Sequence, residues 1–200
     1  MELNDNMILC EANAFPRQLM QPFYSDYVGV VVCHQGMFHF RADGASFVVS
    51  AGETVFLSKG VMFQVTDTTQ ELRYTLLFYR TEQIVDMLGN TVVTMRLYST
   101  IYPSACYVMH TGYEEMLSDY AKMLSRIEGK GDTDIYSSHE HKLLLMAVTY
   151  RLCSIFSNTL KSPTKEMDRK IEIFEELVHL IEEHYTRERS VAFYADKLCL

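Results

Sequence analysis

The feature that most constrains the fold is a series of short, apolar segments between Val28 and Tyr79, each closed by turn residues. An Asp43-Gly44 pair separates two of these segments, and Asp-Gly between apolar-rich runs is a strong hairpin signal. Gly36, Gly52 and Gly60 mark further breaks. Short strands with regular turns predict a small antiparallel barrel or sandwich. The expected strands are Val28–Gln35, Met37–Ala42, Ala45–Ser50, Glu53–Leu57, Val61–Thr66 and Leu72–Tyr79.

After Arg80 the apolar residues recur with a helical period instead. The stretch Thr91–His110 is ambiguous, with a further strand expected around Thr94–Tyr98. Ser190 is expected to cap the last helix, and Asp132 or Asp134 to cap the longest one. The expected helices are Thr81–Leu88, Tyr113–Glu128, Asp134–Leu160, Met167–Tyr185 and Val191–Leu198.

The helix expected over Asp134–Leu160 is apolar around its whole circumference, because Leu143–Val148 is an unbroken apolar run. The strand domain can cover one face of such a helix, so the other face predicts a second subunit. Burial within one subunit, beneath Tyr113–Glu128, is the alternative. We therefore expect a homodimer built on these two helices. The predicted interface residues are Leu117, Leu124, Leu144, Leu145, Val148 and Leu152.

A polar linker with a helix-breaking proline, Pro163, divides the chain. We expect one domain over residues 1–160, with strands at about 8–110 and helices at about 113–160, then a linker over 161–166 and a helical segment over 167–200. The last residues, Leu198-Cys199-Leu200, are apolar, so we expect this segment to be the incomplete start of a further domain.

Charge and hydropathy limit the partners of the chain. Its formal net charge is −8, with 18 Lys and Arg against 26 Asp and Glu, and no basic stripe compensates. The chain alone is therefore expected to bind nucleic acid poorly. No apolar run is long enough for a membrane span, and the acidic, polar N-terminus lacks a secretion signal. We expect a cytoplasmic protein without a membrane partner.

The strand region resembles the cupin barrel, a double-stranded β-helix, found at the N-terminus of AraC-type bacterial transcription regulators. Gly36 lies where the first motif of that barrel ends. In the second motif the family usually has proline at the slot of Ser58, and metal-binding members have histidine at the slot of Phe63. The second motif is carried by Gly52, Ser58, Lys59, Gly60 and Phe63.

The C-terminal segment is similar to the start of the DNA-binding domain of the same family. There a helix ending near an aromatic residue, here His184-Tyr185, leads through a short loop to a Ser-Val opening and an alanine–leucine helix. In the family this helix is the first of a helix-turn-helix. The matching positions are Ser190, Val191, Tyr194, Ala195 and Leu198.

The resemblance argues against a metal and against an enzyme. The positions that hold metal ligands in metal-binding cupins fall on Gly29, within Pro22–Ser25, and on Phe63, and none of these carries a metal-ligating side chain. We therefore expect no bound metal and no other cofactor. No nucleophile elbow or phosphate-binding glycine loop is present in the sequence, which favours a non-enzyme.

The resemblance also places an effector inside the barrel. If Gly29 faces inward, alternation turns Tyr27, Val31 and Cys33 inward and His34 outward. Alternatively, the inward-facing side chains of Tyr27, Val31 and Cys33 simply fill the core. His39 has no assignable register, and His139 and His141 are expected in solvent. The predicted effector residues are Tyr27, Val31, Cys33, Phe63 and Val65 inside the barrel, with Phe15 and Arg17 on an arm before the first strand, over its mouth.

Together these features predict an α+β chain that senses a small organic effector, dimerises, and belongs to a DNA-binding transcription regulator. DNA binding is expected of the full-length protein, not of this segment alone. Two alternatives stay open, a metal-free cupin enzyme of the sugar isomerase or epimerase type and a stand-alone ligand-binding dimer.

Overall fold

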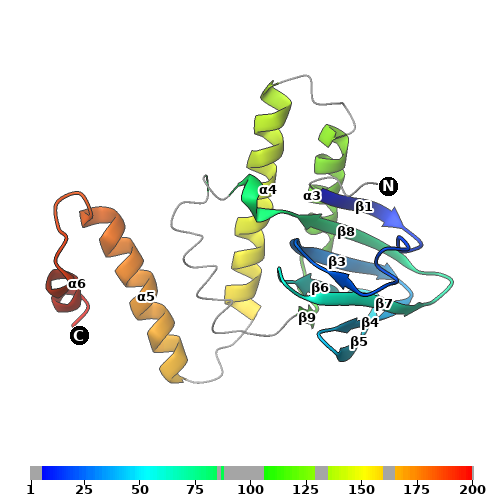
Figure 1. Ribbon diagram of the computed structural model, residues 1–200, viewed down its shortest axis with the longest axis horizontal. Coiled ribbons are helices and arrows are strands. Elements are labelled where there is room, and N and C mark those ends of the chain that lie inside the picture. Colours follow the sequence, from blue (N-terminus) through cyan, green and yellow to red (C-terminus); the bar gives the residue numbers. More distant parts are fainter. Residues whose placement is uncertain (1–5, 85–86, 88–105, 129–134, 160–164, 200) are drawn as a thin grey trace. The chain divides into compact units, whose positions relative to one another are not determined.

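The computed structural model describes residues 6–84, 87, 106–128, 135–159 and 165–199 (Figure 1). The chain forms two compact units. The first contains Met1–Leu88 and Ser104–Ile155, and the second contains Gly89–Pro103 and Phe156–Leu200. Among the described helices, none has the length and apolar character needed to cross a membrane.

The first unit holds two antiparallel sheets. The five-stranded sheet has the order β1 (Asn6–Ala12), β8 (Arg73–Tyr79), β3 (Val28–Gln35), β6 (Thr54–Leu57) and β9 (Cys106–Met109). The four-stranded sheet has the order β2 (Phe23–Tyr24), β7 (Met62–Thr68), β4 (Met37–Ala42) and β5 (Ala45–Ser50).

The Asp43-Gly44 pair forms the β4–β5 hairpin, as its sequence predicts. Ala42 pairs with Ala45, so the two residues between them are the whole loop. Asp43 has φ 46° and Gly44 has φ 86°, and positive φ at both central residues is the requirement of a type I′ turn. This turn matches the twist of the flanking strands and fixes their register.

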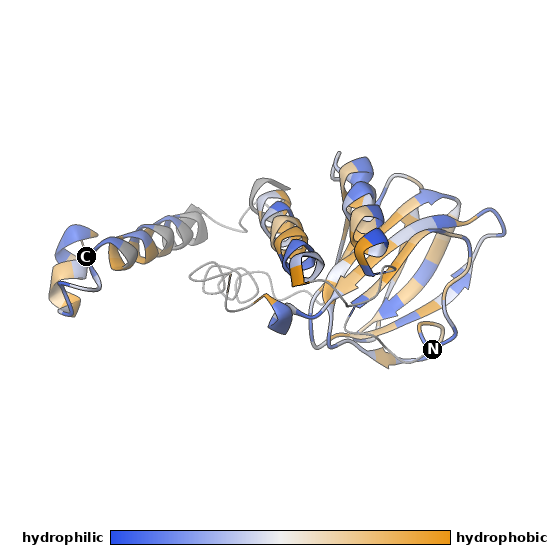
Figure 2. Ribbon diagram, turned by 90° about the horizontal axis from the view of Figure 1, so that it is seen from above, coloured by the Kyte–Doolittle hydropathy of each residue, from blue (hydrophilic) through white to orange (hydrophobic). Residues whose placement is uncertain are grey.

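Strand β3 is buried on both faces, which explains its unbroken apolar sequence. Val31 and Cys33 face the core between the two sheets, whereas Val30 and Val32 alternate to the opposite face. The outer face of the four-stranded sheet is instead exposed at Arg41 and elsewhere. Figure 2 shows the resulting alternation of apolar and polar residues along the strands.

Two helices cover the outer face of the five-stranded sheet. Helix α3 (Glu114–Glu128) contacts β1, β8 and β3. Helix α4 (Ile135–Thr159) is tied to β8 by a hydrogen bond between Tyr79 Oη and Thr149 Oγ1, 2.8 Å apart. Figure 1 shows both helices on one side of the sheets. The first unit therefore has a helical layer and two sheet layers.

The second unit contains helices α5 (Lys165–His184) and α6 (Val191–Lys197). The His184 ring meets the Phe193 ring edge to face at 5.2 Å, and Tyr194 Oη donates to Glu188 O at 2.9 Å. Ser190 occupies the N-cap position of α6, as predicted, but its side chain makes no capping hydrogen bond.

The elements differ from the sequence prediction mainly at the ends of the strand domain. The six predicted strands are found within two residues of their expected bounds, but β1, β2 and β9 were not predicted. Thr81–Leu88 begins as the 3-10 helix η1 (Thr81–Gln83). Helix α5 begins at Lys165, inside the predicted linker 161–166. The strand expected at Thr94–Tyr98 and the caps expected at Asp132 or Asp134 lie outside the described residues.

Candidate functional site

The five residues predicted to face the interior all do so. Tyr27, Val31, Cys33, Phe63 and Val65 belong to the hydrophobic core between the sheets, and each is at most 1% exposed. The alternation argument also placed His34 outward correctly, because its ring bonds to groups on the opposite face of the sheet. The interior side chains thus pack against one another as core.

This interior is aromatic. Phe40 and Phe63 have ring centroids 5.1 Å apart, and the Phe63 ring meets Phe78 edge to face at 6.4 Å. Burial raises the pKa of the Cys33 thiol to about 11, so the thiol stays protonated and behaves as a small apolar group. The chemistry of this space suits an apolar or aromatic molecule better than a charged one.

The segment between β1 and β2 inserts side chains into this interior. Phe15 stacks on Tyr74 with centroids 4.0 Å apart and meets Phe38 edge to face at 5.1 Å. Leu19 is fully buried, and its carbonyl accepts a hydrogen bond from Val65 N at 2.7 Å. The segment predicted as an arm over the barrel mouth therefore follows β1 instead of preceding the first strand, and its Phe15 and Leu19 side chains are part of the core. Arg17, on the same segment, is exposed.

The predicted dimer residues are mostly covered within one chain. Leu117, Leu124, Leu145 and Val148 are fully buried, Leu152 is 8% exposed and Leu144 is half-buried. A different set of α4 residues reaches the surface. These exposed residues are Tyr136, Leu143 and Tyr150, spaced seven apart and 78%, 57% and 46% exposed.

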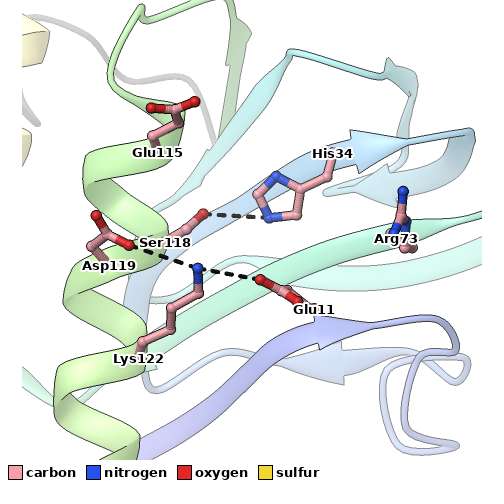
Figure 3. Close-up of a pocket in the computed structure, with 7 residues that line it drawn as sticks. All are labelled: Glu11, His34, Arg73, Glu115, Ser118, Asp119 and Lys122. Carbon is pink, nitrogen blue, oxygen red and sulfur yellow. Dashed lines mark hydrogen bonds and ion pairs between the residues drawn. The ribbon is translucent and has the colours of Figure 1, made fainter.

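A groove of about 410 Å³ lies between α3 and the five-stranded sheet (Figure 3). Helix α3 lines one wall with residues spaced so that they share a face, and β1, β3 and β8 line the other. Glu11 stands at a register shift of β1 with φ 51°, a strained conformation for a residue with a side chain. The lining residues are Glu11, His34, Arg73, Glu115, Ser118, Asp119 and Lys122.

Ion pairing crosses this groove. Lys122 Nζ lies 3.2 Å from Glu11 Oε1 and 3.7 Å from Asp119 Oδ1. The hydrogen bond to Glu11 raises the pKa of the Lys122 ammonium. Burial lowers the pKa of His34, so its imidazole is neutral near neutral pH. Sequence reasoning missed this groove because β1 was not predicted, although the shared face of 115, 118, 119 and 122 on α3 was readable.

His141 is a correction to the sequence prediction. It is half-buried, and its Nε2 lies 3.2 Å from Glu128 Oε1 and 3.1 Å from Asn6 Nδ2. Asn6 Nδ2 also donates to Glu128 Oε1 at 2.7 Å. This cluster ties β1, α3 and α4 together, whereas His139 is exposed as expected.

The remaining predicted positions have the following surroundings. Gly29 lies against the backbone of β8, where an added Cβ would approach Leu77 O to 2.0 Å. Among the described residues, no group of His, Cys, Asp and Glu side chains is arranged to hold a metal ion. At the positions matched to the helix-turn-helix, Ser190 and Val191 are exposed, Val191 at 82%, and three residues are half-buried: Tyr194, Ala195 and Leu198.

Comparisons with known proteins give matches among solved structures alone. No protein family and no curated protein matches the chain. Apo ToxT from Vibrio cholerae matches with 10% identity and a TM-score of 0.44, over 98% of this chain and 71% of that chain. The AraC-like transcriptional activator CuxR matches with 14% identity and a TM-score of 0.39, over 88% and 57%.

A structure of ToxT from Vibrio cholerae with a bound unsaturated fatty acid matches with 14% identity and a TM-score of 0.33, over 90% of this chain and 80% of that chain. At these values the likeness assigns neither a fold nor a function to this chain. Among these structures, CuxR is an AraC-like transcriptional activator, and the sequence motifs of this chain resemble the same family.

Proposed function

We propose that this chain is the effector-sensing and dimerisation part of an AraC-type transcription regulator, with α5 and α6 opening its DNA-binding domain. The observation that carries the proposal is the division of the chain into two compact units. One holds two sheets with an aromatic interior, and the other holds the C-terminal helices α5 and α6, in which the Ser190-Val191 opening starts a helix. A sensor joined to a helix-turn-helix needs two such units.

The effector site is the cupin-like space between the two sheets, at the place that Phe15 fills. Phe15 and Leu19 belong to a connecting segment, not to a strand, so they can leave the core without breaking a sheet. An apolar or aromatic effector would replace the stacking of Phe15 on Tyr74. Arg17, exposed on the same segment, would then anchor a polar end of the effector.

The dimer uses α3 and α4. Because the predicted leucines are largely covered within the chain, the contact falls on the exposed face of α4 that Leu143 centres. Apolar residues spaced seven apart lie along one side of a helix, and this spacing allows two helices to pack against each other. Such a pair would carry an effector-driven change from one sensor to the other.

The first experiment is a thermal-shift screen of the 200-residue chain with a panel of sugars, aromatic acids and an unsaturated fatty acid. A ligand that binds the native state alone raises the unfolding midpoint. We expect a stabilising member whose binding releases the segment that carries Phe15, seen as increased proteolysis between β1 and β2. A panel without any stabilising compound, or stabilisation with unchanged proteolysis, contradicts the proposed site.

The second experiment is a gel shift with the same chain. Its net charge of −8 predicts no tight, sequence-specific DNA binding at physiological salt. The full-length protein should bind its promoter with effector-dependent affinity. An effector that leaves promoter affinity unchanged would contradict the regulatory role.

A further inference from the structure

Two charged groups of opposite sign in the α3 groove have no partner among the described residues. Lys122 forms ion pairs with both Glu11 and Asp119. The side chains of Arg73 and Glu115 line the same groove but take part in no hydrogen bond or ion pair within the described part of the chain. Figure 3 shows Glu115 projecting from α3 and Arg73 from the sheet side. Counting only the described residues, the groove thus offers one unpaired cation and one unpaired carboxylate on opposite walls.

The His34 imidazole lines the same groove and is neutral. His34 Nε2 lies 2.8 Å from Thr75 Oγ1 and 3.3 Å from Ser118 Oγ, and Ser118 Oγ donates to Glu114 O at 2.9 Å. His34 Nδ1 makes no hydrogen bond within the described part of the chain, so the ring keeps one polar atom for a ligand.

We infer that this groove binds a small zwitterion, a molecule of the amino-acid or dipeptide class with one carboxylate and one ammonium group. The Arg73 guanidinium suits a carboxylate, which it can bind through two parallel hydrogen bonds. Glu115 accepts from the ammonium group, and His34 Nδ1 hydrogen-bonds a polar group between the two ends. The cavity of about 410 Å³ lies within the usual range for small-molecule sites.

The mixed charge of the lining selects against simpler ligands. Because Lys122 is paired with Glu11 and Asp119, an anion alone would leave Glu115 unpaired, whereas a cation alone would leave Arg73 unpaired. A zwitterion is the ligand that satisfies both walls. The groove lies on the helix side of the five-stranded sheet, so this site is additional to the effector site proposed between the sheets.

The test is calorimetric titration of the 200-residue chain with glycylglycine, with acetate and ethylamine as singly charged comparisons at equal ionic strength. We expect glycylglycine to bind, and the two comparisons to bind at least tenfold more weakly. The variants Arg73→Gln and Glu115→Gln should each weaken glycylglycine binding by about tenfold, a typical effect of losing one charged hydrogen-bond partner. Both side chains line an open groove, so both variants are expected to fold.

Matched controls are Arg41→Gln on β4 and Glu140→Gln on α4, which change exposed charges away from the groove. They should leave the affinity unchanged, and the imidazole resonances of His34 should shift on titration. Absence of binding at about 10 mM glycylglycine overturns the inference. Equal binding of acetate overturns the ligand class, and binding unaffected by Arg73→Gln and Glu115→Gln overturns the location. None of these results bears on ligands between the sheets.

Discussion

Replacing Phe15 by alanine should open the interior between the sheets while leaving every strand in place. Phe15 is 8% exposed and stacks on Tyr74 at 4.0 Å, so truncation removes a nearly complete aromatic contact. Core Phe→Ala substitutions cost about 3–5 kcal/mol. Phe15 lies on a connecting segment that can partly collapse into the space, which places the expected loss at about 3 kcal/mol.

For a domain of this size, about 3 kcal/mol lowers the unfolding midpoint by roughly 6–12 °C, measurable by differential scanning calorimetry. The vacated space is lined by apolar and aromatic side chains, and such cavities stay dry and take up benzene-sized molecules. Indole at ten times its dissociation constant should return about 1.4 kcal/mol, or roughly 3–6 °C, to the Phe15→Ala variant. Wild type should gain much less, because its own ring fills the site.

Phe47→Ala is the matched control. Phe47 stacks on Phe40 at 5.0 Å but is only partly buried at the edge of the core. Its truncation should cost less and leave no enclosed cavity, so indole should not rescue it. The reasoning fails if Phe15→Ala shifts the midpoint by less than about 2 °C, or if indole stabilises both variants equally.

Three further predictions concern the helices. Burial opposes ionisation of Glu128, but its hydrogen bonds outweigh burial and lower its pKa below 4.5, so its stabilisation is lost as pH falls through that lowered pKa. Glu128→Gln should therefore cost about 1 kcal/mol in urea unfolding near pH 7 and progressively less as the pH falls through that lowered pKa, and a cost that does not change with pH refutes this. Tyr79→Phe should lower the free energy of unfolding by about 1 kcal/mol, because Thr149 Oγ1 keeps its hydrogen bond to Leu145 O. Thr149→Val leaves the buried Tyr79 hydroxyl without a partner and should lower it by about 2 kcal/mol, measured by chemical denaturation. A smaller cost for Thr149→Val than for Tyr79→Phe would contradict this assignment. Leu143→Lys should weaken dimerisation at least tenfold in sedimentation, while the control Val191→Lys, on α6, leaves it unchanged. A wild-type chain that is monomeric at micromolar concentration would exclude the dimer.

Much of the fold could be predicted because its local signals are strong. The Asp43-Gly44 turn fixes a hairpin by backbone geometry alone, and the alternation from Tyr27 to Cys33 fixes which face turns inward. The segments that were missed have weaker signals. Strand β2 is only two residues long, and β1 is interrupted by the register shift at Glu11. Their pairing depends on partners far along the chain.

The candidate sites also combine features that follow from the local sequence with features that depend on distant parts of the chain. Sequence reasoning identified an aromatic interior, because side-chain type and alternation are local properties, whereas the arm that carries Phe15 was expected from the family resemblance. It could not find the α3 groove, whose walls come from residues more than one hundred positions apart, such as Glu11 and Lys122. It also misjudged His141, whose burial depends on Asn6 and Glu128 meeting it from other elements.

The sequence by itself determined the strand and helix periods, the turns, the inward set of side chains and the charge balance. These follow from backbone sterics and from the two-residue and 3.6-residue repeats of side-chain direction. Only the tertiary structure decided that the predicted interface leucines are largely buried within one chain, that Phe15 enters the core, and that Arg73 and Glu115 line one groove. Long-range packing decides such questions, because burial and pairing depend on which distant surfaces meet.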